Sequence, residues 1–280
     1  MSRNYTPAVP LRLRVLVPGT CTWYLYRVIA SAVLGSCLPD VLLVTMNSVQ
    51  LAALHARRPL HGDDEEAIRR VEALYNRPEL AIEAAYSISS ADIKHVNTIA
   101  GSAKAVNYGE ILLRTWAEVL RHVGLTSSDV FVDLGSGRGA LVMLTHLRYQ
   151  LRRSIGVELS RERHQMALSA LQVLRADDST RACISSIELR NEDIRQTDLS
   201  DATCCLLMNA DMPHALISDV WERLLALEHA CVVVTLYAPR DIKVSRLPKR
   251  EVLHGMPQTW AASTDVLIYR LQGRQQGGSR

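Results

Sequence analysis

The chain has 280 residues, a formal net charge of +3 and 48% hydrophobic residues. This length fits one large domain or two modest ones, and the composition is that of a globular protein with a sizeable core. The six cysteines form no C-x-x-C pair and the histidines show no H-E-x-x-H spacing, which excludes a disulfide-stapled scaffold and gives no reason to expect a metal. The mild positive charge permits a polyanionic partner but does not by itself argue for one.

The first hundred residues are predicted to be helical, and residues 1–106 are expected to form an N-terminal helical region. The apolar stretch at 21–37 resembles a targeting segment, but Arg27 interrupts it and the uninterrupted part is too short to span a bilayer. This stretch is therefore expected to be a buried helix, and no membrane is expected as a partner.

Further helices are expected in the same region. One begins at Pro39 and carries apolar residues at helical intervals as far as residue 58. A second spans 62–78, where acids in the first turn favour the positive end of the helix dipole. A third is expected to begin at Pro78, because proline suits the first position of a helix.

From about Tyr108 onward, strands and helices alternate. Apolar runs predict strands at 130–135, 154–159, 185–193, 202–211, 230–239 and 265–271, with helices at 140–151, 161–176 and 213–228. This alternation predicts an α/β fold with a doubly wound, mostly parallel sheet, in which ligands bind beyond the carboxyl ends of the strands. The domain is expected to span 107–271, and residues 272–280 are expected to form a disordered basic tail.

The stretch "VDLGSGRGALV" leaves the first predicted strand and enters a helix through three glycines, Gly135, Gly137 and Gly139. Without side chains at these positions, the backbone can turn tightly and a ligand can approach closely. The spacing also satisfies the G-x-G-x-x-G/A fingerprint of dinucleotide-binding proteins, with Glu158 near the position of the ribose-binding acid. Spacing alone therefore leaves a nicotinamide or flavin cofactor open.

Charge favours S-adenosylmethionine over a dinucleotide. Asp133 places a carboxylate two residues before the first glycine, where a pyrophosphate would be repelled. S-adenosylmethionine carries no phosphate, and an acid beside the loop attracts its positive groups. Glu158 is expected to accept hydrogen bonds from both ribose hydroxyls, Asp193 to accept one from the adenine amino group, and Ile194 to pack on the ring.

A second motif narrows the family. Together with the glycine loop, the stretch "VNYGEILLRTWAEVL" at 106–120 resembles the disruptor-of-telomeric-silencing family of histone lysine methyltransferases, as do "GVEL" and "LLMNAD". The resemblance covers about 107–271 and implies a class I methyltransferase-like fold without a SET domain. One departure is Met208-Asn209-Ala210, where the family often has Asn-Asn-Phe. Another is Ile194, which stands where an aromatic often stacks on adenine.

The resemblance also implies roles for individual residues. The loop of Tyr108, Gly109 and Glu110 would close over the cofactor, Asn209 would face the sulfonium, and Trp260 would wall a lysine channel. The expected catalytic residues are Asn209, Trp260 and Tyr108. The expected cofactor-binding residues are Tyr108, Gly109, Glu110, Asp133, Gly135, Gly137, Gly139, Glu158, Asp193, Ile194 and Asn209.

By the same resemblance, the expected activity is transfer of a methyl group to a lysine in the globular core of nucleosomal histone H3, in the nucleus. A basic loop is expected to contact DNA phosphates through Arg240, Lys243, Arg246, Lys249 and Arg250. Two alternatives stay open. One is a methyltransferase of the same fold acting on RNA or a small molecule, and the other is a non-catalytic chromatin-binding module.

Overall fold

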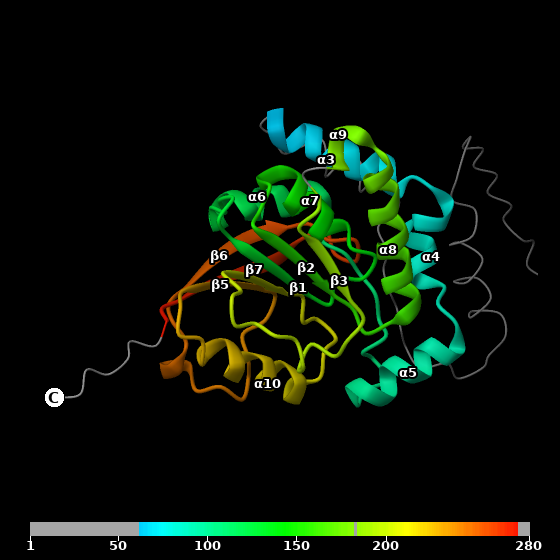
Figure 1. The fold of residues 1–280 in the computed structure, drawn as a ribbon. Helices are drawn as coiled ribbons and strands as arrows, with labels where there is room; N and C mark the ends of the chain where they lie inside the picture. Colours follow the sequence, from blue (N-terminus) through cyan, green and yellow to red (C-terminus); the bar gives the residue numbers. More distant parts are fainter. Residues whose placement is uncertain (1–61, 182–183, 274–280) are drawn as a thin grey trace, which may run out of the picture. The chain divides into compact units, whose positions relative to one another are not determined.

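The computed structural model describes residues 62–181 and 184–273 (Figure 1). The helices expected at 21–37 and 39–58, and the tail after residue 273, lie outside the described residues. No helix in the described ranges is both long and apolar enough to cross a bilayer.

Within the described ranges, the helical segments before α6 (Leu113–Val123) are α3 (Gly62–Tyr75), the 3-10 turn η1 (Pro78–Leu80), α4 (Ile82–Tyr86) and α5 (Ser90–Ala100). The helix expected at 62–78 is confirmed and ends shortly before Pro78. The helix expected to begin there is interrupted, because Ala81 adopts an extended backbone between η1 and α4. α5 begins at a side-chain cap in which Ser89 accepts a hydrogen bond from the N–H of Asp92.

The sheet has seven strands in the order β3-β2-β1-β4-β5-β7-β6. They are β1 (Val130–Leu134), β2 (Arg153–Val157), β3 (Ile187–Arg190), β4 (Cys204–Leu207), β5 (Cys231–Thr235), β6 (Arg250–Met256) and β7 (Thr264–Leu271). The first five are parallel, and β7 runs antiparallel to both β5 and β6. The expected doubly wound, mostly parallel sheet is confirmed. β6 was not expected, since Arg250 was assigned to a loop.

Helices cover both faces of the sheet (Figure 1). They are α6 (Leu113–Val123), α7 (Ala140–Tyr149), α8 (Arg161–Ala176), the short α9 (Asp178–Arg181) and α10 (His214–Leu225), with the 3-10 turn η2 (Val244–Arg246) before β6. α6 and α7 lie over one face and α10 lies over the other. The three helices expected at 140–151, 161–176 and 213–228 are thereby confirmed.

Each face of the sheet has its own apolar core, because alternate residues of a strand point to opposite sides. On β1, Phe131 packs on the side of α6, where its ring centroid lies 5.8 Å from that of Trp116. On the other face, Val132 belongs to the cluster around Trp221 of α10. The adjacent cysteines of β4 divide in the same way, with Cys204 in the first cluster and Cys205 in the second.

Buried acids attach the N-terminal helices to the sheet domain. Asp64 of α3 is 1% exposed and forms ion pairs with Arg121 of α6 and Arg148 of α7, at 3.1 and 2.6 Å. Asp92 of α5 accepts hydrogen bonds at the first turn of α8, among them one from the Ser160 hydroxyl at 2.5 Å. Contacts therefore cross the domain boundary expected at residue 106.

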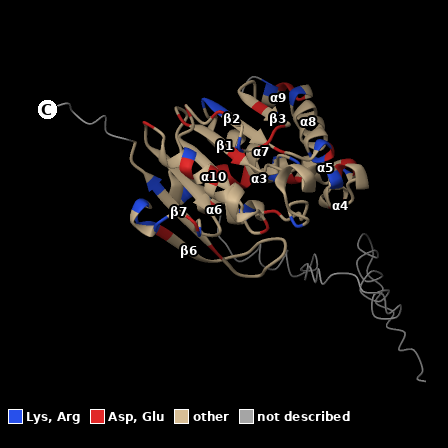
Figure 2. Ribbon diagram, turned by 90° about the horizontal axis from the view of Figure 1, so that it is seen from below, with Lys and Arg blue, Asp and Glu red and all other residues tan. Residues whose placement is uncertain are grey.

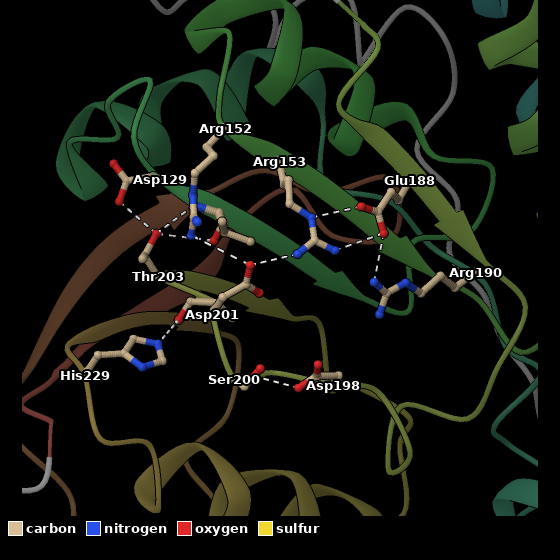
Figure 3. A network of polar contacts seen from close by, with 12 residues as sticks. Asp129, Arg152, Arg153, Glu188, Arg190, Asp198, Ser200, Asp201, Thr203 and His229 are labelled. Atoms are coloured by element: carbon tan, nitrogen blue, oxygen red, sulfur yellow. Dashed lines mark hydrogen bonds and ion pairs between the residues drawn. The ribbon is translucent and has the colours of Figure 1, made fainter.

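Charged residues of both signs are interspersed along the ribbon (Figure 2). At the amino ends of the central strands they neutralise one another in an ion-pair network (Figure 3). Arg153 pairs with Glu188 at 2.9 Å and with Asp201 at 2.7 Å, and Thr203 donates a hydrogen bond to Asp129 at 2.8 Å. The acids named at this edge therefore already have partners.

Candidate active site

A cleft of about 350 Å³, including its open mouth, lies at the carboxyl edge of the central strands. Its lining is Tyr108, Gly109, Glu110, Ile111, Asp133, Gly135, Ser136, Gly137, Ala140, Leu141 and Met208. Six of these residues were expected to bind the cofactor. They come from two segments, the loop before α6 and the end of β1 with the turn that follows it, which the fold brings together at one edge.

The glycine turn has the backbone conformation that its sequence predicts. Gly135, Gly137 and Gly139 have φ angles of 105°, 54° and 83°, in the left-handed region that side chains strain. A Cβ on Gly137 would also meet the hydroxyl of Tyr108 at 2.5 Å. The position is therefore restricted to glycine both by its backbone and by the ring packed against it.

The N–H groups of this turn already have protein acceptors. Those of Gly135 and Ser136 both donate to the carbonyl of Val157 at 2.9 Å, and that of Gly137 donates to Glu158 Oε2 at 2.8 Å. The next two N–H groups donate to the Tyr108 hydroxyl and to the carbonyl of Ser136. A pyrophosphate needs such donors free at the helix start, so this turn is poorly suited to a dinucleotide.

Asp133 is a buried carboxylate without a hydrogen-bond partner in the part of the chain that the structure describes. It is 3% exposed and lines the cleft. Burial, together with the nearby carboxylates of Glu158 and Glu110, raises the pKa of Asp133 to about 8. A buried acid of this kind is costly unless a cationic group binds beside it, so Asp133 fits a ligand that carries an ammonium.

Glu158 directly follows β2 and holds the glycine turn in place. Its two carboxylate oxygens accept hydrogen bonds from the N–H groups of Gly137 and Ser160, both at 2.8 Å. Burial raises the pKa of Glu158, although Arg163 and these two N–H groups oppose the effect. Each carboxylate oxygen keeps a second lone pair, which leaves acceptors for the two hydroxyls of a ribose.

The loop of Tyr108, Gly109 and Glu110 is held by two buried arginines. Arg138, inside the glycine turn, contacts both oxygens of Glu110 with its Nε and Nη2 at 2.6 and 2.7 Å. The guanidinium of Arg163 lies 4.4 Å from the centre of the Tyr108 ring. Burial on its own would raise the pKa of Glu110, but Arg138 and the Tyr108 hydroxyl lower it, so this carboxylate is ionised.

Trp260 packs against this loop, beside Gly109, which lines the cleft. A methyl group built on Gly109 would overlap the Trp260 ring. The backbone before Trp260 is paired with the loop as well, because Glu110 and Thr259 exchange two hydrogen bonds at 2.9 and 3.0 Å. The two segments assigned from the sequence to the cofactor and to the substrate are therefore neighbours.

Asn209 follows β4, as expected, but its amide does not face the cleft. Its Nδ2 donates to the carbonyl of Tyr237 at 2.9 Å, and the N–H of Tyr237 donates to its Oδ1 at 3.0 Å. It is 2% exposed, and its neighbour Met208 lines the cleft instead. Asn209 does not cap α10, which begins after Pro213. A direct contact of Asn209 with the cofactor stays a prediction.

The residues expected at the adenine lie after β3, outside the lining of the cleft. Asp193 is ion-paired with Arg195 at 2.5 Å, and although burial opposes it, this pairing lowers the pKa of Asp193. Ile194 is buried in the core on the α10 side. Their roles at the adenine therefore stay predictions, and an adenine amino group would compete with Arg195 for the carboxylate.

The family described as "Histone methylation protein DOT1" matches residues 86–250, more than half of the chain. The chain belongs to this DOT1 family. It is a methyltransferase, and its cofactor is S-adenosylmethionine, as the acids around the glycine turn predict. The match includes the glycine turn, Glu158 and Asn209, and it begins within α4. No curated protein sequence matches the chain.

Solved structures resemble this DOT1-family chain at low identity. An RNA methyltransferase from Salinibacter ruber in complex with S-adenosyl-L-homocysteine is 17% identical, covering 59% of this chain and 94% of that one with a TM-score of 0.42. A SAM-dependent O-methyltransferase from Thermotoga maritima is 17% identical, covering 61% and 69% with a TM-score of 0.41. TYW2 from M. jannaschii in complex with AdoMet is 12% identical, covering 57% and 76% with a TM-score of 0.41.

The DOT1-family cofactor fits the residues that are present. Asp133 offers an unpartnered carboxylate to an ammonium, and Glu158 offers acceptors to a ribose. Among residues 62–181 and 184–273 there is no cluster of side chains that could hold a metal ion. Sequence reasoning missed Arg138, Arg163 and Thr259. The only signal for Arg138 was its place inside the glycine turn, and nothing local marked the other two.

Cofactor affinity should rise with pH up to about 8. Below that pH, Asp133 holds a proton in the empty cleft, and a bound ammonium favours its ionised form. Binding then releases a proton, and each pH unit below 8 weakens affinity by up to about tenfold. Calorimetry between pH 6 and 9 measures this effect. The difference between the wild type and Asp133→Asn isolates Asp133, since titration of the cofactor is common to both. Equal pH profiles for the two proteins would refute the assignment.

Proposed function

We propose that this chain transfers a methyl group from S-adenosylmethionine to a lysine in the globular core of nucleosomal histone H3, in the nucleus. The observation that supports it most is the DOT1 match over residues 86–250, and Trp260, which follows the matched residues, packs against Gly109 of the cleft lining. S-adenosylmethionine supplies an electrophilic methyl group on a sulfonium. The residues of the chain have to hold it, exclude water and admit the nucleophile in line.

The binding groups are arranged so that one end of the cofactor is fixed by charge. Asp133 holds an ammonium, Glu158 a ribose, and the glycine turn brings its backbone close to both. No residue has to act as a dedicated base. A lysine side chain has a pKa near 10.4 in water, and an apolar channel lowers it by disfavouring the charged form. The face of Trp260 then tolerates the cationic product.

In the proposed site, Asn209 positions its neighbour Met208 and its hydrogen-bond partner Tyr237. Its two hydrogen bonds to Tyr237 tie the end of β4 to the end of β5. Met208, which lines the cleft, directly precedes it. An effect of Asn209 on turnover therefore acts through the placement of Met208 and Tyr237.

The nucleosome is the proposed partner, and the loop before β6 together with Arg250, the first residue of β6, is the proposed DNA contact. Arg240, Lys243, Lys249 and Arg250 are exposed. Arg246 is different, because it forms an ion pair with Glu222 at 2.5 Å and its charge is partly neutralised. The four exposed cations are therefore the proposed phosphate-binding set, and Arg246 is left out of it.

A labelled-cofactor assay tests the substrate. Nucleosomes, free histones, tRNA and cofactor without acceptor are offered in parallel to equal amounts of protein. Transfer to histone H3 in nucleosomes supports the proposal. Transfer only to RNA would identify the RNA methyltransferase alternative, and cofactor binding without transfer to any acceptor would identify a non-catalytic module.

Neutralising the four exposed cations should lower nucleosome methylation and flatten its salt dependence. Each lost phosphate contact reduces the steepness of the plot of log affinity against log salt concentration by about 0.9. The slope of the variant with all four cations changed to glutamine should therefore be shallower by up to about 3–4. The control neutralises four exposed cations on α3, α5 and α8, namely Arg69, Lys94, Arg161 and Arg175. Cofactor affinity should be unchanged in both variants. An unaltered slope in the loop variant would remove this loop from the substrate interface.

A further inference from the structure

Glu110 stands where the cofactor cleft and the Trp260 segment meet. Its N–H donates to Thr259 Oγ1 at 2.9 Å, and the N–H of Thr259 donates to its carbonyl at 3.0 Å. The next residue along, Ile111, forms a β-bridge with Gln258. These contacts make a short antiparallel ladder between two segments far apart in the sequence.

The side chain of Glu110 points the other way, into the glycine turn. Both carboxylate oxygens are held by Arg138, and the Tyr108 hydroxyl donates to one of them. The side chain of Glu110 is thus held by the glycine turn, and its backbone is held by Thr259. The ion pair between Arg138 and Glu110 is largely buried, with 10% and 14% of the two side chains exposed. We therefore expect Glu110 to move little relative to the glycine turn.

Trp260 is placed by the residue before it and by Gly109. A Cβ on Gly109 would overlap Cε3 of the Trp260 ring, so the ring packs directly against the loop. Besides this packing, the hydrogen bonds of Thr259, the residue before Trp260, connect Trp260 to the cofactor cleft through Glu110. The hydroxyl of Thr259 is the only side-chain group in that ladder.

We propose that Thr259 is a positioning residue that couples the cofactor cleft to the substrate wall formed by Trp260. Occupation of the cleft fixes the loop of Tyr108 and Glu110, and the Thr259 hydroxyl transmits that placement to Trp260. The part of this inference that concerns the lysine substrate rests on the proposed function. The coupling between cofactor and Trp260 does not, because it is a property of the protein and its cofactor alone.

The test compares Thr259→Val with Thr259→Ser. Valine keeps the shape but removes the acceptor, which leaves the N–H of Glu110 unpaired, whereas serine keeps the hydroxyl. The wild-type reference and both variants all carry Trp23→Phe. Trp116 and Trp221 are 0% exposed, so Trp260 is then the partly exposed tryptophan that acrylamide reaches. The thermal midpoint of each variant checks that the fold is kept.

The first readout is acrylamide quenching with and without S-adenosylhomocysteine. In the wild type and Thr259→Ser, the ligand should reduce quenching of Trp260, and in Thr259→Val it should not. The second readout is steady-state kinetics on nucleosomes. Thr259→Val should raise KM for the nucleosome about tenfold, the equivalent of about 1.4 kcal/mol, while the affinity for the cofactor stays within about twofold and serine restores KM.

Gly109→Ala separates this inference from the proposed function, because it displaces the Trp260 ring and keeps the Thr259 hydroxyl. A raised KM in Gly109→Ala with wild-type quenching and KM in Thr259→Val would overturn the coupling and leave the function standing. The opposite outcome is also distinct. If the effect of the ligand on quenching is lost in Thr259→Val and kept in Thr259→Ser, but the protein methylates no nucleosomes, the coupling is supported and the proposed function is rejected.

Discussion

Replacing Arg138 by leucine should lower the free energy of unfolding by about 3–5 kcal/mol, the usual cost of breaking a buried ion pair by removing one partner. Arg138 makes two hydrogen bonds to Glu110 and one to the carbonyl of Leu80 at 2.6 Å. Leucine keeps the apolar stem but leaves a buried carboxylate without its counterion. This would be the largest loss of stability of any single change considered for the site.

Urea unfolding of the wild type, Arg138→Leu and the double variant Arg138→Leu/Glu110→Gln measures the effect. The double variant should recover part of the loss, because no unpaired charge is left buried. Arg69→Leu is the matched control, since Arg69 also pairs with a glutamate at 2.6 Å but has 68% of its side chain exposed. Such a surface pair contributes at most about 1 kcal/mol. Equal losses for Arg138→Leu and Arg69→Leu would contradict the role of burial.

The parallel half of the fold could be predicted because each of its elements carries a local signal. Val130–Leu134 is apolar except for Asp133 and is buried at every position, as expected of a strand covered on both faces. Arg161–Ala176 begins and ends where the sequence predicts, because Ser160 caps it and apolar residues recur at helical intervals. In these elements the local and the long-range preferences agree.

β6 could not be predicted for the opposite reason. Arg250, Glu251, His254 and Gly255 are exposed, and the pairing with β7 shifts register between Leu253 and Met256. An edge strand with few apolar residues and an irregular register has no period-2 pattern. Its existence follows from pairing with β7, which the sequence of β6 alone does not encode.

The candidate site divides in the same way. Gly135, Gly137 and Glu158 could be found because the turn and the end of the next strand have a fixed local spacing. Arg138 and Thr259 could not, since their partners lie 28 and 149 residues away along the chain. The same holds for Asn209, whose place after β4 was predicted but whose partner Tyr237, two residues after β5, was not.

Asp133→Asn should weaken binding of S-adenosylmethionine by at least about tenfold, or about 1.4 kcal/mol, and yet make the empty protein more stable. The carboxylate has no partner among the described residues, and its pKa is raised from 3.8 to about 8. The folded state therefore holds a proton that the unfolded state loses above pH 3.8. Stability falls as pH rises from about 4 to about 8, by up to about 1.4 kcal/mol per pH unit.

Asparagine is neutral at every pH and has nearly the same shape, so the variant avoids this loss. Its advantage in urea unfolding should grow from pH 5 to pH 8 and level off above that. Asp193→Asn is the control of opposite sign, because Arg195 lowers the pKa of Asp193 and the ionised form is the stabilising one. That variant should be less stable than the wild type at pH 7. The contrary result is that Asp133→Asn destabilises the ligand-free protein at pH 8, as Asp193→Asn is expected to do. The Asp133 carboxylate would then have a partner within the protein, and the proposal that it binds a cationic ligand would be wrong.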